Sequence, residues 1–420
     1  MTNNDIVSST ETIPNVSAEG QKSANVPNLR FPQYTSEWRK NRLETLVKMS
    51  KGYGITKDQL SVEGQPCILY GELYTTYKNE VISEVKSKTD IDTKGLVYSQ
   101  ANDVIIPSSG ETPEDIATAC CVMLDDILLG GDLNILRPYN DNGCFLSYQL
   151  NGRRKYDIAR VAQGASIVHL HNEHLRSLNI FTPESLDEQE KIVSLLALID
   201  ERIDTQSKII EEIKSIKNGI SHKVFNDNKF ITTYLPLSQF ATLKNGYAFK
   251  STTYIDEGKY KVITIANVTG ERYYSLEKYN TINTLPMDIQ EHQQLKIGDI
   301  LISLTGNVGR VSYCSTNDTL LNQRVGLLEI KNKVYTEYLY QVLSSLDFEK
   351  TMQSCGQGAA QMNIGKSDIE NYLIPIPSSE EMMLKISNLL LKLDEKIEIE
   401  KDMLSAYKKQ KAYLLRQMFI

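Results

Sequence analysis

The chain has 420 residues, of which 24% are charged, and its formal net charge is -7. This length allows two or three domains with sizeable cores, and the composition excludes a collagen, a disulfide-rich miniprotein and a wholly disordered chain. No apolar run approaches the ~18 residues of a transmembrane helix, and six scattered cysteines without a CxxC pair argue against a zinc ribbon and favour a reducing, cytoplasmic compartment.

The N-terminal part of the chain predicts a tail followed by a first domain. Residues 1–25 are expected to be a disordered tail, since residues 1–24 are polar, with almost no large apolar side chains and no signal-peptide pattern. Residues 26–184 contain short apolar runs such as Cys67–Tyr70 and Val104–Ile106, separated by Gly, Asn, Asp and Ser. That pattern predicts an α+β domain with a twisted, loop-rich sheet.

Residues 185–225 predict a long helix. Ser185 and Glu188 have the spacing of a capping box, and apolar residues then recur at alternating steps of four and three. Such steps form a coiled-coil seam that needs a partner helix. The apolar seam positions are Ile192, Leu196, Ile199, Ile203, Ile210 and Ile213, and the polar ones are Gln206 and Lys217.

The same order of elements then recurs. Residues 226–377 have the composition of a second α+β domain, and residues 378–420 predict a second long helix whose capping box would be Ser378 and Glu381. Its apolar seam positions are Ile386, Leu390, Leu393, Ile397, Leu404 and Leu414, and its polar ones are Glu400 and Lys411. Polar seam residues cost stability but specify register and partner.

The recurrence is a tandem duplication. Residues 163–225 align without a gap to positions 194 further on, and the same shift places Gly52 and Tyr53 on Gly246 and Tyr247. The middle is more divergent, and residues 103–107 resemble 299–303 at a shift of 196. Two such helices in one chain can bury each other's seams if they pair antiparallel. The predicted fold is therefore α+β, with two pseudo-repeated α/β domains separated by a pair of long antiparallel coiled-coil helices.

Polar loops in both domains are the candidates for ligand contact. Glycines allow a backbone to approach a phosphate, Lys and Arg supply counter-charge, and Asn, Gln and Arg can bond base edges. For Tyr53 and Tyr247, packing is favoured over base stacking. The candidate DNA-contacting residues are Lys51, Tyr53, Thr56, Ser108, Ser109, Thr112, Arg153, Arg154, Lys155, Lys244, Asn245, Tyr247, Lys250, Thr305, Asn307, Arg310, Gln323 and Arg324.

No catalytic or metal-binding constellation is predicted. The sequence has no GxSxG, HExxH or dinucleotide-binding fingerprint and no [DNS]-P-P-[YF] tetrapeptide of the amino-methylating DNA enzymes. His169, His171 and His174 are close in sequence, but positions 363 and 365 of the other copy carry no matching ligand. A surface or packing role is therefore favoured for these histidines over metal ligation.

The arrangement resembles the specificity (S) subunits of type I restriction–modification systems. The segment from Val26 to Pro32, followed by Trp38 and Leu43, is similar to the start of many such subunits. Further similarity covers the segments just before the predicted long helices and the first half of these helices. These motifs are Ile374–Pro377, Leu186–Ile192, Ile199–Ile203 and Leu393–Ile397.

The resemblance implies DNA recognition without catalysis. Each domain would be a target-recognition domain that reads one half of a bipartite site in double-stranded DNA. The paired helices would set the spacer and dock two methyltransferase (M) subunits, and restriction (R) subunits would join them. No cofactor would be bound by this chain, since S-adenosylmethionine, ATP and Mg²⁺ belong to the partner subunits. No membrane association is implied.

Two other classes of function compete with this interpretation. An enzyme that both reads and methylates DNA would need the missing tetrapeptide, and a coiled-coil scaffold or adaptor without nucleic-acid recognition explains the duplicated domains less economically. The domains are almost neutral: residues 30–180 carry 17 basic and 19 acidic side chains, and residues 231–380 carry 13 and 15. Because phosphate binding needs cationic surface, we expect the chain alone to bind DNA weakly and M subunits to supply much of the contact.

Overall fold

The computed structural model describes residues 25–162, 164, 168–356 and 362–420, and it divides the chain into two compact units. Unit 1 is Met1–Ile203 with Ala406–Ile420, and unit 2 is Asp204–Ser405. Each unit therefore combines one α+β module with a part of each long helix. The predicted tail lies outside the described residues except for Asn25.

Unit 1 contains two main sheets. The five-stranded sheet has the order β2 (Val47–Lys51), β11 (Leu133–Pro138), β7 (Asp103–Pro107), β9 (Cys120–Val122) and β5 (Val81–Ile82). The four-stranded sheet has the order β10 (Leu128–Leu129), β4 (Gln65–Ile68), β6 (Ser87–Thr89) and β3 (Leu60–Ser61). Two antiparallel pairs are β1 (Arg39–Arg42) with β13 (Asn179–Thr182) and β8 (Ser109–Gly110) with β12 (Val168–His169). The helices are α1 (Leu43–Leu46), η1 (Lys57–Gln59), α2 (Glu72–Thr75), α3 (Pro113–Ile116), α4 (Gly143–Asn151), α5 (Lys155–Val161) and α6 (Asn172–Arg176).

Unit 2 repeats this plan. One four-stranded sheet has the order β15 (Ala241–Asn245), β22 (Val325–Ile330), β19 (Ile300–Ser303) and β20 (Val311–Tyr313). The other has the order β17 (Asn280–Ile282), β16 (Tyr260–Ile263), β21 (Thr319–Leu321) and β18 (Gln294–Leu295). Strands β14 (Ile231–Pro236) and β23 (Leu373–Pro377) pair antiparallel, as β1 and β13 do in unit 1. The helices are η2 (Leu237–Gln239), η3 (Ser251–Thr253), η4 (Glu291–Gln293), η5 (Lys333–Tyr335), α8 (Thr336–Leu343), α9 (Leu346–Cys355) and α10 (Lys366–Glu370).

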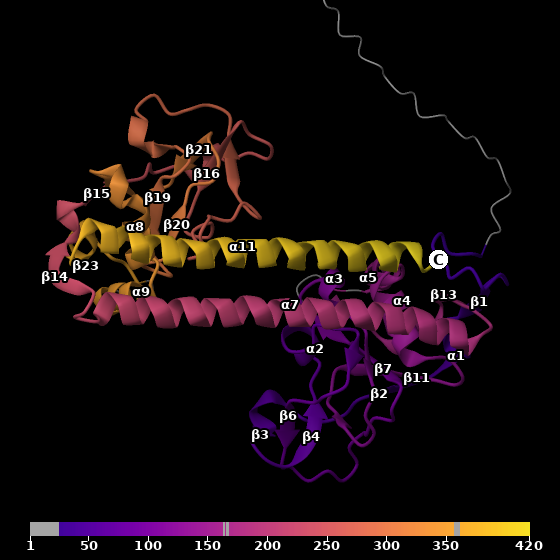
Figure 1. Ribbon diagram of the computed structural model, residues 1–420. Coiled ribbons are helices and arrows are strands. Elements are labelled where there is room, and N and C mark those ends of the chain that lie inside the picture. Colours follow the sequence, from indigo (N-terminus) through magenta and orange to yellow (C-terminus); the bar gives the residue numbers. More distant parts are fainter. Residues whose placement is uncertain (1–24, 163, 165–167, 357–361) are drawn as a thin grey trace, which may run out of the picture. The chain divides into compact units, whose positions relative to one another are not determined.

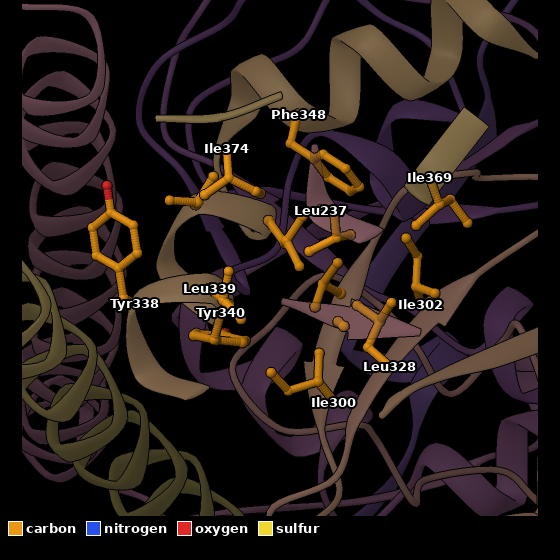
Figure 2. Close-up of a cluster of buried hydrophobic side chains, with 14 of the residues drawn as sticks. Leu237, Ile300, Ile302, Leu328, Tyr338, Leu339, Tyr340, Phe348, Ile369 and Ile374 are labelled. Carbon is orange, nitrogen blue, oxygen red and sulfur yellow. The ribbon is translucent and has the colours of Figure 1, made fainter. Parts of the chain in front are cut away.

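Apolar strands place the core of each module between its main sheet and its helices. All five residues of β7 and all four of β19 are buried, as the short apolar runs predict. In unit 2, β19 and β22 contribute Ile300, Ile302 and Leu328 to a cluster that α8 and α9 cover (Figure 2). Phe348 of α9 is fully buried in it.

Two long helices, α7 (Leu186–Asn226) and α11 (Glu380–Gln417), contribute to both units. In unit 1 the first part of α7 packs against the end of α11, with Leu196 and Leu414 in one apolar cluster (Figure 1). In unit 2 the end of α7 packs against the start of α11, with Phe225 and Ile386 in one cluster. The segments therefore run in opposite directions within each unit, and the predicted α+β fold with antiparallel long helices is confirmed.

The helix starts differ from the predicted capping boxes. Glu188 accepts from Arg30 through both carboxylate oxygens, at 2.7 and 2.8 Å, and from the Trp38 indole at 3.1 Å. The Glu188 side chain is only 1% exposed. Its bonds to Arg30 and Trp38 join α7 to the start of the module. In α11 the capping hydroxyl belongs to Ser379, whose Oγ accepts from the Met382 amide at 3.1 Å, because the helix begins one residue later than the Ser378 box requires.

Candidate nucleic-acid interface

A glycine holds the first candidate loop of each module against a neighbouring strand. The Tyr53 amide donates to Leu129 at 3.1 Å, and the Tyr247 amide donates to Leu321 at 2.8 Å. A Cβ on the preceding residue, Gly52, would lie 2.0 Å from the carbonyl oxygen of Gly130. The equivalent Gly246 has the same close approach, to the carbonyl oxygen of residue 322 at 2.2 Å. Only glycine fits such a contact, which explains why this position is the same in both copies.

A second set of backbone hydrogen bonds brings other loops of each module to the same edge. In unit 1 the Ser108 amide donates to Asp132 at 2.7 Å, and the Leu170 amide donates to Ser108 at 3.0 Å. In unit 2 the Leu304 amide donates to the carbonyl of residue 324, and the amide of residue 364 donates to Leu304, both at 3.0 Å. Loops distant in sequence therefore meet at equivalent places in the two modules.

We call these converging segments the loop edge of each module. The loop edge of unit 1 comprises Lys51–Thr56, Ser108–Ser109, Gly131–Asp132 and His169–His171. The loop edge of unit 2 comprises Asn245–Tyr247, Thr305, Asn322–Arg324 and Asn363. A cavity of about 680 Å³ adjoins the first edge, lined in part by Gly54–Lys57, Leu69–Glu72 and Asp132.

In unit 1 most of the candidate residues lie on this edge. Lys51, Tyr53 and Thr56 are exposed. Ser108 is buried and its hydroxyl donates to Asp132 Oδ1 at 3.3 Å, whereas Ser109 Oγ lies 3.3 Å from His169 Nδ1. The next loop residue, Thr112, is exposed and accepts from the Asp115 amide at 3.1 Å as the cap of α3.

The basic cluster of residues 153–155 is placed elsewhere, where α4 is followed by α5. The Arg154 guanidinium pairs with Asp157 at 2.7 Å, lies 5.2 Å from the Phe181 ring centre and contacts the carbonyl of Ile420. The structure therefore uses Arg154 to hold the C-terminal end of the chain, while Arg153 is exposed.

In unit 2 the loop edge carries Gln323 and Arg324, both exposed, beside Tyr247 and Thr305. The Tyr247 hydroxyl donates to Asp288 at 2.8 Å, and this bond raises the pKa of Tyr247 above its ordinary value. The Tyr247 ring also packs 4.9 Å from the Phe249 ring, centre to centre.

The other basic candidates of unit 2 differ in their surroundings. Arg310 Nε lies 3.3 Å from Glu349, and Lys244 lies 3.3 Å from Glu329. Asn245, Lys250 and Asn307 are exposed, and the Asn245 carbonyl accepts from Gln293 at 3.3 Å. Exposed amide and guanidinium groups on this edge can bond both phosphates and base edges.

The part of the chain that the structure describes has neither a candidate metal-binding cluster nor a helix that could span a membrane. No group of three or more His, Cys, Asp and Glu side chains there has an arrangement that could hold a metal ion. None of the described helices combines the length and apolarity needed to cross a bilayer.

The family described as the type I restriction modification DNA specificity domain matches residues 35–215 and 233–406, and hence both copies of the repeat. The chain belongs to this family. The family assignment supports the specificity-subunit function that the duplication and motifs indicate, and it does not support the scaffold without nucleic-acid recognition.

Individual relatives agree with this assignment. The specificity subunit of a type I restriction enzyme from Methanocaldococcus jannaschii is 25% identical over 405 residues, covering 89% of this chain and 91% of the relative. A putative type I specificity subunit from Mycoplasma genitalium is 21% identical over 399 residues, covering 91% of this chain and 94% of the relative. The crystal structure of a type I S subunit from M. genitalium has the same fold, with a TM-score of 0.56, 18% identity, and 94% and 99% of the two chains covered.

The candidate residues do not include the histidines of the first loop edge, for which the sequence favours a surface or packing role, or Asn363 of the second, and the structure places them beside candidate residues. The signal was available, because the shift of 194 that aligns the copies also aligns His169 with Asn363. The contact of His169 with Ser109, 60 residues away in sequence, could come only from the pairing of β8 with β12.

Proposed function

We propose that each module reads one half of a bipartite site in double-stranded DNA through its loop edge. The observation that carries this proposal is that the two edges share a backbone scaffold but differ in their side chains. Gly131 and Asp132 directly precede β11 in unit 1, and Gln323 and Arg324 directly precede the equivalent strand β22 in unit 2, so the two pairs correspond. A constant scaffold with different hydrogen-bonding groups suits two readers of different base sequences.

The helices would connect reading to modification. The two copies of the long helix have the same seam pattern, which suits two similar docking surfaces for two M subunits. In this proposal the chain is non-catalytic, and S-adenosylmethionine, ATP and Mg²⁺ are bound by M and R subunits. Because its ligand in this proposal is DNA inside the cell, we place its action in the bacterial cytoplasm.

The direct test is adenine-methylation mapping in cells that express one set of M subunits with this chain. We expect a two-part motif that disappears when the chain is omitted. Replacing the loop-edge side chains of unit 2 should alter one half of the motif and leave the other unchanged. If the chain forms no complex with M subunits, or no DNA is methylated, the proposal is wrong.

A further inference from the structure

Three of the chain's five histidines gather at the loop edge of unit 1, two of them on the edge and His174 next to it. The rings of His169 and His171 stack with centres 6.1 Å apart and planes 9° apart. The rings of His171 and His174 lie 5.5 Å apart, centre to centre. His174 Nδ1 accepts from the His171 amide at 3.3 Å, which orients the third ring toward the second. We call these residues the histidine cluster.

Candidate residues from two other segments contact this cluster. Lys51, at the end of β2, places its Nζ 3.3 Å from His171 Nδ1. Ser109, in β8, lies 3.3 Å from His169 Nδ1. The lysine and His169 are exposed, whereas His171 and His174 are half-buried. Three segments therefore assemble a surface that can carry several positive charges.

The electrostatic surroundings oppose protonation of His171 in the free chain. Burial, followed by the charge of Lys51 and the proximity of the other two histidines, lowers the pKa of His171 below its ordinary value. Glu173 acts in the opposite direction on His171 and is itself paired electrostatically with Arg176 and Lys51. Asp132 is a further acidic residue of this loop edge, and its Oδ1 accepts from the Ser108 hydroxyl at 3.3 Å.

A bound anion would reverse this balance. A phosphate placed beside Lys51 and the imidazoles would favour their charged forms, as an opposite charge within a few ångströms does in general. The histidines are suited to this role because their ordinary pKa lies near neutral pH.

The equivalent positions of unit 2 cannot respond in this way. At the shift of 194, His169 corresponds to Asn363, His171 to Gly365 and Lys51 to Asn245, while His174 corresponds to an aspartate. The pairing of residues 305 and 363 has the same place in the fold as that of Ser109 and His169. Unit 2 therefore lacks the histidines and the lysine at these positions, and the histidine beside its own loop edge, His292, contacts the Asn245 carbonyl at 3.1 Å instead.

We propose that the histidine cluster of unit 1 binds backbone phosphates of its DNA half-site and takes up protons as it does so. This inference rests on the proposed function. The affinity of unit 1 for its half-site should therefore rise as the pH falls. The equivalent positions of unit 2 should give the other half-site no such pH dependence. A group whose pKa is raised in the complex adds affinity below that pKa, and the added affinity is lost as the pH rises through it.

The experiment uses the full chain with its M subunits and the duplex that methylation mapping identifies. Affinity is measured by fluorescence anisotropy at fixed ionic strength between pH about 6 and about 8. The double variant His169→Asn with His171→Gly introduces the residues of unit 2. His222→Asn is the matched control, because this exposed histidine of unit 2 pairs with Asp347 instead.

We expect affinity for the wild type to rise roughly tenfold toward low pH for each histidine whose pKa shifts by about one unit. The double variant should lose the part of that rise that His169 and His171 contribute, and His222→Asn should keep the whole rise. Titration calorimetry in two buffers of different ionisation enthalpy should show net proton uptake by the wild type, a measurement that needs no variant to fold.

Three results would count against the inference in distinguishable ways. An affinity independent of pH, or proton uptake of zero, refutes the inference while leaving the proposed function intact. A double variant that keeps the wild-type pH profile assigns the protons to other groups and also refutes it. If mapping returns no methylated site, the proposed function fails and the inference fails with it.

Discussion

The Nζ of Lys411 lies 2.5 Å from Oδ1 of Asp200, and the same pair recurs one repeat away, where Lys217 lies 2.5 Å from Asp394. Both pairs join α7 to α11, once in each unit. Each also has a tyrosine from its module, with Lys411 Nζ 5.8 Å from the ring centre of Tyr148 and Lys217 Nζ 5.9 Å from that of Tyr340. The two lysines are two of the four polar seam positions of the sequence, and each joins the antiparallel helices within one unit.

Removal of Lys411 should destabilise unit 1. Its ammonium group also lies 2.5 Å from Glu80, and all three side chains are at most 14% exposed. Although burial opposes its charge, the carboxylates of Glu80 and Asp200 raise the pKa of Lys411 above its ordinary value. Lys411→Met would leave two buried carboxylates without a cation, at a cost of about 3–5 kcal/mol.

The loss of stability is measured by urea unfolding of the full chain, with a spectroscopic signal that reports on unit 1. Lys409→Met is the control, since Lys409 is exposed on the same helix. An equal unfolding midpoint for Lys411→Met and Lys409→Met would show that the buried ion pair contributes nothing to stability.

Acid should weaken unit 2 through Glu337. Burial favours its neutral form, but the hydrogen bonds and charge of Arg272, at 2.8 Å, outweigh burial and lower the pKa of Glu337. A carboxylate with a depressed folded-state pKa stabilises the fold above its unfolded value, and this contribution is lost as the pH falls. We expect the urea midpoint of unit 2 to drop as the pH falls below the ordinary glutamate value of 4.5.

Arg272→Met should flatten this pH dependence, because it removes the cation that depresses the pKa. Glu277→Gln, which neutralises an exposed carboxylate of unit 2, should leave the profile unchanged. If the urea midpoint of Arg272→Met falls with pH as steeply as that of the wild type, other carboxylates cause the acid sensitivity.

Alanine should be poorly tolerated at Gly246. Its Cβ would meet the carbonyl oxygen of Asn322 at 2.2 Å, so strand β21 or the loop has to move, and we expect a loss of about 1–3 kcal/mol. Gly219→Ala is the matched control, since it lies in α7 with nothing within 4 Å and should gain about 0.5–1 kcal/mol of helix stability. Chemical denaturation gives the free energy of unfolding of both variants. An unchanged value for Gly246→Ala would contradict the close contact between residue 246 and the Asn322 carbonyl.

Arg324→Ala should weaken recognition of one half-site. Arg324 is exposed on the loop edge of unit 2, and a bidentate arginine–base contact is worth about 1–3 kcal/mol. Methylation mapping should then show relaxed sequence preference in one half of the motif only. Lys350→Ala, an exposed cation on α9, is the control. Relaxation in both halves, or in neither, would argue against Arg324 as a reader.

Lengthening the paired helices should change the DNA spacer. Gln206 donates to the carbonyl of Glu400 at 3.1 Å, so the two polar seam positions mark where the helices match within unit 2. A heptad inserted near Gln206, with a matching heptad near Glu400, adds about 10.5 Å of helix. At about 3.4 Å per base pair, the spacer should grow by about three base pairs while both half-sites stay the same. Methylation mapping gives the spacer length directly, and an unchanged spacer would show that the paired helices do not set it.

The duplication, the long helices and the fold class followed from the sequence alone, because a seam of alternating steps and a constant shift of 194 are visible in residue order. The loop glycines Gly52 and Gly246 were also found by their matching positions. What the sequence could not assign was the partner of each polar side chain. Arg154 and Lys51 have the same charge, yet one contacts Ile420 and the other His171.

Those choices are made by the tertiary structure. Helix formation depends on neighbours three and four residues apart, so the sequence by itself determines where the long helices lie in the chain. The loop edges depend on strand pairing between distant segments, as when β8 and β12 bring Ser109 to His169. Glu188 likewise follows the pattern of a cap but pairs with Arg30, 158 residues away, because the β1–β13 pairing brings the start of the module to the start of α7.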